Sequence, residues 1–296
     1  MPVGIVVKAY GGYGYVQEQE ANRIRECALR GKLRRQGEIL VGDRVRFAAL
    51  ASGQYVVEEV LPRRSQLIRP PIANVDQVLV VLAWKQPSPV LTLLDRILVL
   101  CSYEKLTAVL CVNKTDLLRD DEAVPDWPNV YRHAGYQVLM TSAVSGQGID
   151  NLRRVLAGHI TVLAGPSGVG KSSLLNSLIP GLGLKTGTIS RKLKRGRHVT
   201  RHVELFQVSE DGWVADAPGF SSLKFPPIPS QELDAYFPEM EVRRHLCRFS
   251  GCLHYKEPDC AVKEDVSKGI IADHRYQNYL LFLDELTAVE RSFKRD

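Results

Sequence analysis

The sequence has no apolar run long enough to cross a membrane. A membrane-spanning helix needs about 20 consecutive apolar residues, and the best candidate, LTLLDRILVLC, is interrupted by Asp95 and Arg96. The amino terminus, MPVGIVVKAYGGYG, lacks the basic segment, the apolar segment and the small-residue cleavage site of a secretory signal. Internal repeats and low-complexity stretches are also absent. These absences argue against membrane, secreted and repeat proteins, and we expect a cytoplasmic protein without a membrane partner.

The composition is that of a folded protein with more than one domain. The 296 residues are 45% hydrophobic and 24% charged, which is ordinary for a globular chain, and this length predicts two or three domains. The net charge is +6 and the positive charge is clustered: residues 1–70 hold twelve Lys and Arg against seven Asp and Glu, and residues 190–202 hold six and no acid. Such clusters favour a polyanionic partner, although a solvated surface has the same appearance.

Residues 1–70 predict a small β-barrel. Short strand-like pieces such as GIVVKAY, ILVGDRVRFAAL and QYVVEEVL are separated by turns. Along residues 44–49, RVRFAA, apolar side chains at every second position would form one face of a strand. An OB-type barrel, a fold that binds oligonucleotides, is built from such strands, so the fold supports RNA binding weakly. The proline-flanked segment that follows, LPRRSQLIRPP, reads as a linker.

The middle of the chain predicts an α/β domain with a mainly parallel sheet. VDQVLVVLAW and LTAVLCVNK are near-continuous apolar runs, as expected for strands buried on both faces. LTLLDRILVLCSYEK, between them, has helical spacing, and later HITVLAG and KSSLLNSLI supply another strand and helix. Alternation of this kind is typical of α/β folds. After FPPIPS at 225–230 we expect a separate module with a short helix capped by Ser230 and a long helix over about 270–294.

The stretch GPSGVGKS has the pattern of a phosphate-binding loop, and it lies between a strand and a helix as that loop requires. Its glycines let backbone amides point at phosphate groups, and the amino end of the next helix adds a positive dipole. Lys171 would contact the β and γ phosphates and contribute to catalysis, and Ser172 would bind Mg²⁺. The predicted phosphate-binding residues are Gly165, Pro166, Ser167, Gly168, Val169, Gly170, Lys171, Ser172 and Ser173.

Three shorter motifs belong with this loop. In DAPG, Asp216 would hold Mg²⁺ through a water, and the amide of Gly219 would sense the γ phosphate. In NKTD, Asp116 offers two acceptors to the two donors on the edge of guanine, which adenine cannot match. Asn113 would brace the pocket, and the stem of Lys114 would lie along the base. The third motif, TSA, comprises Thr141, Ser142 and Ala143, and would add a backbone amide to the guanine oxygen.

In the sequence the two base-reading motifs, NKTD and TSA, come first, followed by the phosphate loop and then by the Mg²⁺ motif DAPG. In familiar small GTPases the phosphate loop comes first. Strands of a sheet can be reconnected at the surface while the site residues keep their places, because chain termini often lie close together. We therefore predict a circularly permuted P-loop GTPase domain.

The whole arrangement resembles the RsgA family, also called YjeQ or YloQ, whose permuted GTPases act in maturation of the bacterial small ribosomal subunit. The shared stretches include NVDQVLVVLA, LLDRILVL and GRH. The resemblance implies a multidomain α/β protein: an OB-type barrel at 1–70, the permuted GTPase domain at 71–225, and a zinc-binding helical module at 226–296. It implies GTP and GDP, the small ribosomal subunit and its rRNA as partners, and a monomer.

A cysteine cluster near the carboxyl terminus predicts a structural zinc site. CRFSGCLHYKEPDC offers Cys247, Cys252, His254 and Cys260, a tetrahedral donor set whose spacing matches the one the family uses. The alternative is a disulfide plus a free thiol, which the lack of a secretory signal disfavours. The three other cysteines, Cys27, Cys101 and Cys111, lie in apolar strings and read as core residues.

The sequence departs from familiar GTPases around the hydrolysis site. Phe220 stands where small GTPases carry the glutamine that orients the attacking water. The resemblance points to His198, in GRH, as the group that holds this water when the basic loop is ordered on the ribosome; the alternatives are that it contacts RNA or is solvated. Val199 replaces one of the family's consecutive threonines, so Thr200 is the expected switch ligand of Mg²⁺, with Thr186 and Thr188 as less favoured substitutes.

Three functional hypotheses follow. The first is a GTPase stimulated by the small ribosomal subunit, which acts in late subunit maturation and hydrolyses GTP to drive its own release. The second is an RNA-binding adaptor in which GTP is a structural ligand and hydrolysis is incidental. The third is an ATP-dependent P-loop enzyme, which the paired NKTD and TSA motifs argue against.

Overall fold

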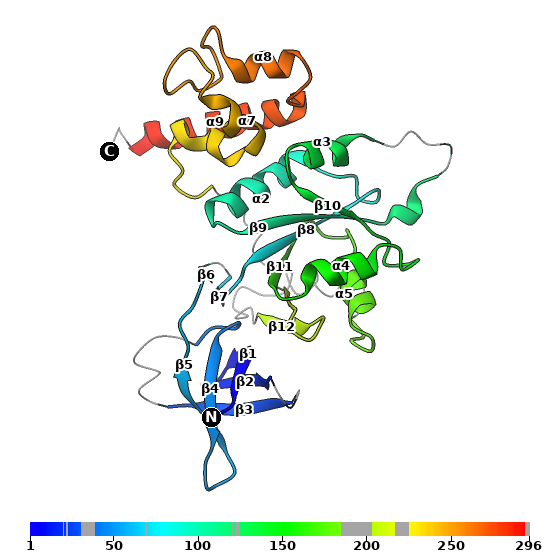
Figure 1. Ribbon diagram of the computed structural model, residues 1–296, viewed down its shortest axis with the longest axis vertical. Helices are drawn as coiled ribbons and strands as arrows, with labels where there is room; N and C mark the ends of the chain where they lie inside the picture. Colours follow the sequence, from blue (N-terminus) through cyan, green and yellow to red (C-terminus); the bar gives the residue numbers. More distant parts are fainter. Residues whose placement is uncertain are drawn as a thin grey trace.

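A computed structural model describes residues 1–19, 21, 23–30, 39–68, 70–119, 121, 125–184, 203–216 and 225–293 of the chain, with only the backbone at 216 and 293. Three regions follow one another in space as they do in the sequence (Figure 1). A barrel holds the amino terminus, a mixed sheet covered by helices lies in the middle, and a helical module holds the carboxyl terminus. Within the described residues, no helix has the length and apolar character needed to cross a membrane.

The amino-terminal region is a closed five-stranded barrel with the strand order β1-β2-β3-β5-β4, closed by pairing of β1 with β4. Its interior is filled by apolar side chains, among them Val6, Val16, Val45 and Phe47. The alternation predicted for residues 44–49 holds up to Phe47, but Ala49, the last residue of the strand, is exposed. The strands are β1 (Val3–Tyr10), β2 (Tyr13–Glu18), β3 (Ile24–Leu29), β4 (Arg44–Ala49) and β5 (Tyr55–Val60).

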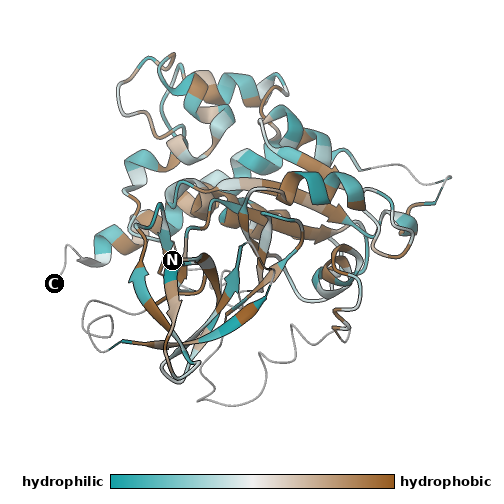
Figure 2. Cartoon of the chain, turned by 60° about the horizontal axis from the view of Figure 1, so that its bottom comes forward, coloured by the Kyte–Doolittle hydropathy of each residue, from teal (hydrophilic) through white to brown (hydrophobic). Residues whose placement is uncertain are grey.

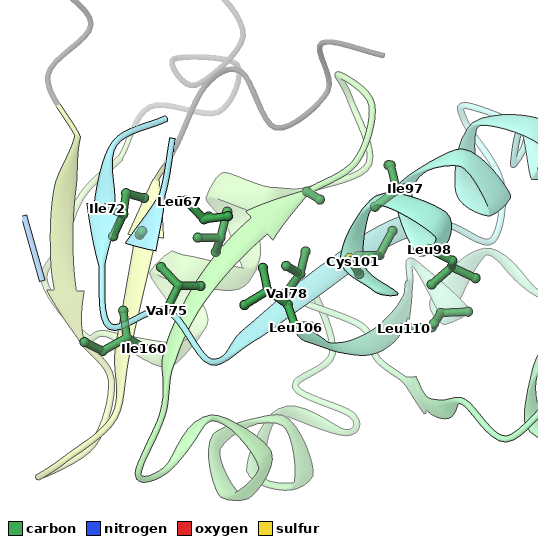
Figure 3. Packing of buried hydrophobic residues seen from close by; sticks show 14 of the residues in the cluster. Leu67, Ile72, Val75, Val78, Ile97, Leu98, Cys101, Leu106, Leu110 and Ile160 are labelled. Carbon is green, nitrogen blue, oxygen red and sulfur yellow. The ribbon is translucent and has the colours of Figure 1, made fainter. Parts of the chain in front are cut away.

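The segment between barrel and sheet is more ordered than a linker, which corrects the prediction made for it. It forms a small hairpin of β6 (Gln66–Leu67) and β7 (Ile72–Ala73), and Leu67 and Ile72 are buried. These two side chains belong to a hydrophobic cluster that continues through the strand β8 (Gln77–Ala83) to the helix α2 (Leu91–Tyr103) (Figure 3). The hairpin therefore fixes the barrel to the rest of the molecule through the same core that supports the sheet.

The central sheet has the order β10-β9-β8-β11-β13-β12. All neighbouring strands are parallel except the edge pair β12 and β13. The strands of this sheet are more hydrophobic than the helices beside them (Figure 2). The strands are β8 (Gln77–Ala83), β9 (Thr107–Asn113), β10 (Gln137–Met140), β11 (Ile160–Ala164), β12 (Glu204–Gln207) and β13 (Trp213–Asp216). The helices are α2 (Leu91–Tyr103), η1 (Thr115–Leu117), α3 (Trp127–His133), α4 (Ile149–Leu156) and α5 (Lys171–Leu178).

The sheet explains why the motifs meet although their order is unusual. From β8 the chain proceeds outward to β9 and β10, whereas from β11 it crosses to the edge strand β12 on the other side and then returns to β13, which lies between them. Adjacent strands whose connections leave in opposite directions form a switch point, and ligands of open α/β sheets bind at the carboxyl ends of the strands there. The switch point lies between β8 and β11, so residues that follow β8, β9, β10 and β11 converge on one edge of the sheet.

The carboxyl-terminal region is a helical module built around its own core. It contains η2 (Ser230–Tyr236), α7 (Pro238–Arg244), α8 (Ala261–Ser267) and α9 (Asp273–Phe293). The long helix was predicted at about 270–294. The predicted cap was wrong: Ser230 is the first residue of a 3-10 helix, and its hydroxyl donates to Glu290 Oε2 at 2.9 Å instead of capping η2. A backbone N–H of the same serine bonds the second oxygen of Glu290, which ties η2 to α9.

A buried ionic cluster joins this module to the α/β domain. Arg275 of α9 is 1% exposed, and its guanidinium donates to Asp95 of α2 and to Glu239 of α7, each at 2.6 Å. Two more donors complete the shell of Asp95: Tyr131 Oη on α3 and Asn278 Nδ2 on α9, both at 2.6 Å. Because a charge this deep is tolerated only with full pairing, the cluster fixes the orientation of α9 on α2.

Candidate nucleotide-binding and metal sites

The phosphate loop runs from β11 to α5 along a path that only glycine permits at two positions. Gly165 has φ +124°, and a Cβ there would lie 2.1 Å from the carbonyl oxygen of Val81 in β8. Gly170 has φ +97°, and a Cβ there would lie 2.3 Å from Asn113 Nδ2. Both separations are far below contact distance, and both φ angles are ones that side chains disfavour. The loop therefore lies directly against β8 and the end of β9.

Lys171 and Ser172 open helix α5 immediately after the loop. Lys171 Nζ donates to the carbonyl oxygens of Gly165 and Pro166, each at 2.7 Å, so the ammonium lies across the loop. Ser172 is buried, and Ser173 is half-buried. Ser167 and Gly168 are exposed, whereas Val169 points into the core. The amino end of α5 carries the positive end of the helix dipole, which favours an anion at the loop.

Asn113, the last residue of β9, connects the phosphate loop to the base-reading segments. It is 1% exposed. Its Nδ2 donates to the carbonyl oxygen of Val169 at 2.9 Å, and its Oδ1 accepts from the amide of Ala143 at 3.2 Å and from Thr141 Oγ1 at 3.3 Å. One side chain thus bonds a residue 56 positions later and two that are about 30 positions later. The motifs separated in the sequence form a single site.

The residues expected to read the base lie at the open edge of this site. Asp116 is exposed, and Ser142 Oγ donates to its Oδ1 at 2.5 Å, which holds the carboxylate in place. Lys114 adopts a left-handed conformation with φ +65°, and its Nζ donates to the carbonyl oxygen of Gln86. Its Cε lies 3.9 Å from the position of a Cβ on Gly170, so the lysine stem passes over the phosphate loop.

Sequence reasoning missed the loop after β8 and two supporting hydroxyls. A Cβ on Gly168 would lie 3.7 Å from Pro87, which places the Gln86–Pro87 turn beside the phosphate loop. Ser177 Oγ donates to the carbonyl oxygen of Ala143 at 3.1 Å and ties α5 to the TSA segment. Thr115 Oγ1 donates to the carbonyl oxygen of Thr141 at 3.0 Å. The turn could have been found from the sequence, because β8 and β11 end at the same sheet edge.

Several predicted residues lie outside the part of the chain that the structure describes. These are His198, Thr200 and Gly219, together with Thr186, Thr188 and Phe220. Asp216 is described by its backbone, which ends β13. Since β13 pairs with β11 in parallel, with Val162 opposite Ala215, the chain at Asp216 leaves the sheet at the same edge as the phosphate loop.

The second site is the cysteine cluster of the helical module. The ligand atoms of Cys247, Cys252, His254 and Cys260 all lie within 4.8 Å of one another. His254 Nδ1 is 3.2 Å from Cys260 Sγ and 3.5 Å from Cys247 Sγ. His254 is fully buried, Cys252 and Cys260 are largely buried, and Cys247 is half-buried.

The donor set fits a metal ion better than the alternative that the sequence left open. All six cysteines of the chain are free, so a disulfide within the cluster is excluded in this structure. Burial raises the pKa of the Cys252 thiol to about 12 and also raises the pKa of Cys260. Thiolates at such positions need a nearby cation, and three sulfurs with one imidazole suit tetrahedral Zn²⁺. Cys27, Cys101 and Cys111 are buried core residues, as predicted.

The basic surplus of the barrel is partly neutralised within it. Four arginines form ion pairs with barrel or linker acids: Arg25 with Glu18, Arg30 with Glu58, Arg46 with Glu59, and Arg63 with Asp43. Four of the remaining cations, Lys32, Arg34, Arg35 and Arg69, lie outside the described residues. Exposed Tyr10 and Tyr13 flank the turn between β1 and β2, with Lys8 Nζ 5.6 Å from the ring of Tyr10. Aromatic and basic side chains side by side are a common feature of single-strand binding surfaces.

The two halves of the sheet, the phosphate loop and the Asn113 contacts define a P-loop GTPase domain whose strands are circularly permuted. The family model for the RsgA GTPase matches residues 60–226, and the model for the RsgA N-terminal domain matches residues 3–57. The chain belongs to the RsgA family of GTPases and is a GTP-hydrolysing enzyme.

Known relatives cover nearly the whole chain. The small ribosomal subunit biogenesis GTPase RsgA of Moorella thermoacetica is 50% identical over 291 residues, which is 98% of this chain and 99% of the relative. The protein of the same name from Carboxydothermus hydrogenoformans is 47% identical over 291 residues, covering 98% of this chain and 99% of its own. Among solved structures, YjeQ from Thermotoga maritima is similar with a TM-score of 0.79 and 39% identity, covering 97% of this chain and 98% of its own. YloQ, described as a circularly permuted GTPase, has a TM-score of 0.79 and 37% identity, covering 97% and 96%.

Proposed function

We propose that this protein is a GTPase stimulated by the small ribosomal subunit, and that it acts in late maturation of that subunit. It would bind the subunit through rRNA as a monomer in the cytoplasm, and GTP hydrolysis would drive its release. The relatives named above carry a role in small-subunit biogenesis in their names. Their similarity over nearly the whole length of the chain supports the same role here.

One observation carries the nucleotide part of the proposal: Asn113 hydrogen-bonds both the phosphate loop and the TSA segment. A ligand that occupied the loop with its phosphates would place its base beside Asp116. There the carboxylate accepts hydrogen bonds from the two donors of guanine. Adenine presents an acceptor in place of one of these donors, so it cannot make both hydrogen bonds. The site would therefore select GTP over ATP.

Each group of the phosphate site has a distinct chemical task. Lys171 would exchange its bonds to loop carbonyls for bonds to the β and γ phosphates, where negative charge develops during transfer. Mg²⁺ would be held by Ser172, by Thr200, and by Asp216 through a water. It would supply charge neutralisation at the same oxygens. The amide of Gly219 would sense the γ phosphate.

We further propose that His198 positions the attacking water, because Phe220 stands where a glutamine is usual. Single-turnover hydrolysis of GTP by His198→Ala in the presence of small subunits tests this assignment. We expect a large loss of rate while subunit binding is retained. A rate equal to that of the wild-type protein, with binding intact, would show that another group holds the water.

The division of labour follows the proposed domains. The barrel at 1–70 and the zinc module at 226–296 would bind rRNA. The GTPase domain at 71–225 would determine, through its nucleotide state, when this binding ends. The chain leaves the sheet at Asp216 and enters the zinc module at η2, so loss of the γ phosphate could move that module directly. Cys247, Cys252, His254 and Cys260 would hold one structural Zn²⁺.

The decisive experiment measures GTP and ATP hydrolysis by the purified protein with and without small ribosomal subunits. Salt should be near the physiological concentration, since charge-driven RNA contacts weaken as salt rises. We expect turnover that is selective for GTP and rises at least about tenfold with subunits, a barrier change of ~1.4 kcal/mol. GTP binding without stimulation would favour the adaptor, in which GTP is a structural ligand. Equal use of ATP would contradict the base site.

A further inference from the structure

A buried carboxylate lies beside the metal-binding cluster. Asp234, in η2, is 3% exposed, and its Oδ2 is 3.2 Å from His254 Nε2 and 3.1 Å from Arg244 Nε. The other oxygen, Oδ1, is buried and has no hydrogen-bond partner among the residues that the structure describes. Burying a carboxylate with so few partners is costly. A carboxylate at the protein surface would not lose its hydration in this way, so the buried position of Asp234 requires an explanation.

The contact between Asp234 and His254 determines the tautomer of the histidine. An ionised carboxylate only accepts hydrogen bonds, so the Nε2 of His254 must carry the proton that it donates to Asp234. In a neutral imidazole the other nitrogen then keeps its lone pair. That nitrogen, Nδ1, is the one that faces the sulfurs of Cys247 and Cys260. The lone pair is therefore directed into the group of metal ligands.

The backbone of His254 is held independently of its ring. Tyr276 Oη donates to the carbonyl oxygen of His254 at 2.7 Å, and Tyr279 Oη donates to the carbonyl oxygen of Leu253 at 2.9 Å. These bonds fix the loop, but they leave the imidazole free to turn about its own bonds. Among the described contacts, the hydrogen bond to Asp234 is the polar one that holds the far side of the ring.

We propose that Asp234 is a positioning residue for the metal site: it orients His254 so that Nδ1, and not Nε2, binds the metal. Arg244 supplies the positive charge that compensates the buried carboxylate. Carboxylates that accept from a metal-binding histidine are a recurrent feature of zinc sites, and their loss typically weakens metal binding 10–100-fold. The inference rests on the proposed zinc site, and the test below separates the two.

The test compares two Asp→Asn variants of the full chain that change the same charge in the same module. Asp234→Asn replaces the buried carboxylate by an uncharged amide, a weaker acceptor for His254 Nε2. Asp259→Asn makes the same change at an exposed carboxylate that precedes the ligand Cys260 and pairs with Arg248 at the surface. Zn²⁺ affinity is measured by competition with a chromophoric chelator. We expect about 10–100-fold weaker binding for Asp234→Asn and a change of less than about threefold for Asp259→Asn. Equal affinities for Asp234→Asn and the wild-type protein would overturn the proposal.

A second measurement remains decisive if Asp234→Asn does not fold. In the ¹⁵N-labelled, Zn²⁺-loaded wild-type protein, long-range ¹H–¹⁵N correlations identify which imidazole nitrogen of His254 carries a proton. We expect a protonated Nε2 and a metal-bound Nδ1, whereas coordination through Nε2 would overturn the role of Asp234. If the wild-type chain fails to bind one equivalent of Zn²⁺, the zinc site itself is wrong, which is a different outcome.

Discussion

Asp116 is an exposed carboxylate held by Ser142, and we propose that its side chain sets the choice of base. In Asp116→Asn one acceptor becomes an NH₂ donor, which opposes the amino group of guanine but matches the carbonyl oxygen that xanthine carries at that position. We expect GTP affinity to fall at least about 100-fold, since hydrogen bonds to charged groups contribute ~1.5–3 kcal/mol each. Affinity for xanthosine triphosphate should rise. Equilibrium binding of fluorescent nucleotides measures both.

Asp126→Asn is the matched control for this change. Asp126 is also exposed, and it accepts a hydrogen bond from Asn129 at the start of α3. This variant alters net charge by the same amount, so unchanged GTP affinity would show that the effect at Asp116 is local. A loss of GTP binding at Asp116 without any gain for the xanthine nucleotide would contradict direct reading of the base.

Gly165 provides a test of backbone packing at the phosphate loop. Gly165→Ala would place a methyl group 2.1 Å from the carbonyl oxygen of Val81, and a strand cannot retreat as a flexible side chain can. Overpacking of this kind costs ~1–3 kcal/mol and an unfavourable φ adds ~1–2. We expect the free energy of unfolding in urea to fall by ~2–5 kcal/mol. Gly181→Ala is the control, because its φ is +83° but nothing lies within 4 Å; it should lose only ~1–2 kcal/mol.

At this scale the sequence predicts the residues that carry chemistry better than those that support them. Gly165, Lys171 and Asn113 were predicted from short motifs that dictate their chemistry, and the structure brings these residues to one place, while their roles stay predictions. Ser142 was assigned only a backbone role in reading the base, yet its hydroxyl holds Asp116. Asp234 was not found at all, because nothing in the sequence around it marks a contact with a histidine 20 positions later.

Helix α2 is the element that links the site to the zinc module. The strand that precedes it, β8, borders the phosphate loop. Asp95 of α2 accepts a hydrogen bond from the buried guanidinium of Arg275. In Arg275→Met the carboxylates of Asp95 and Glu239 lose their shared cation. Breaking a buried pair from one side typically costs ~3–5 kcal/mol, and we expect a loss of that size in urea unfolding. Burial alone would lower the pKa of Arg275, but the charges of Asp95 and Glu239 raise it well above its ordinary value, so the guanidinium stays charged at any working pH.

Two further variants show whether burial of the ionic cluster is the cause of the stability loss expected for Arg275→Met. Arg248→Met removes an exposed partner of Asp259 in the same module and should cost at most ~1 kcal/mol. The double variant Asp95→Asn with Arg275→Met also removes the charge of Asp95, leaves Glu239 as the remaining acid of the cluster, and should be more stable than Arg275→Met alone. If Arg275→Met and Arg248→Met unfold alike, the cluster does not hold the module on α2.

Helices and strands were predictable where the hydrophobic pattern is strong within one short stretch of sequence. Strands β8, β9 and β11 are continuous apolar runs, and α2 and α9 have clear helical spacing, so their existence followed from the sequence. The β6–β7 hairpin did not, because its two-residue strands are set by burial of Leu67 and Ile72 in the common core (Figure 3). The pairing of Arg275 with Asp95 spans 180 positions, which no local pattern encodes.

At the scale of the whole molecule, the permutation places an RNA-binding candidate at each end of the GTPase domain. The barrel precedes β8, and the zinc module follows β13, the strand that ends at the same sheet edge as the phosphate loop. In an arrangement that began with β11, the chain would instead leave β13 toward β8 inside the same domain. Permutation is thus what brings the segment after Asp216 directly to η2 and the metal site.

The consequence is a difference in subunit affinity between nucleotide states. We expect the protein to bind small ribosomal subunits at least about tenfold more tightly with a non-hydrolysable GTP analogue than with GDP, a coupling of ~1.4 kcal/mol. Sedimentation binding at several salt concentrations measures it. Both affinities should fall as salt rises, because RNA contacts release counterions, while their ratio should persist, since the γ phosphate acts inside the GTPase domain. Equal affinities in the two states would exclude the switch, and a ratio that vanishes with salt would mean that the nucleotide changes only the surface charge.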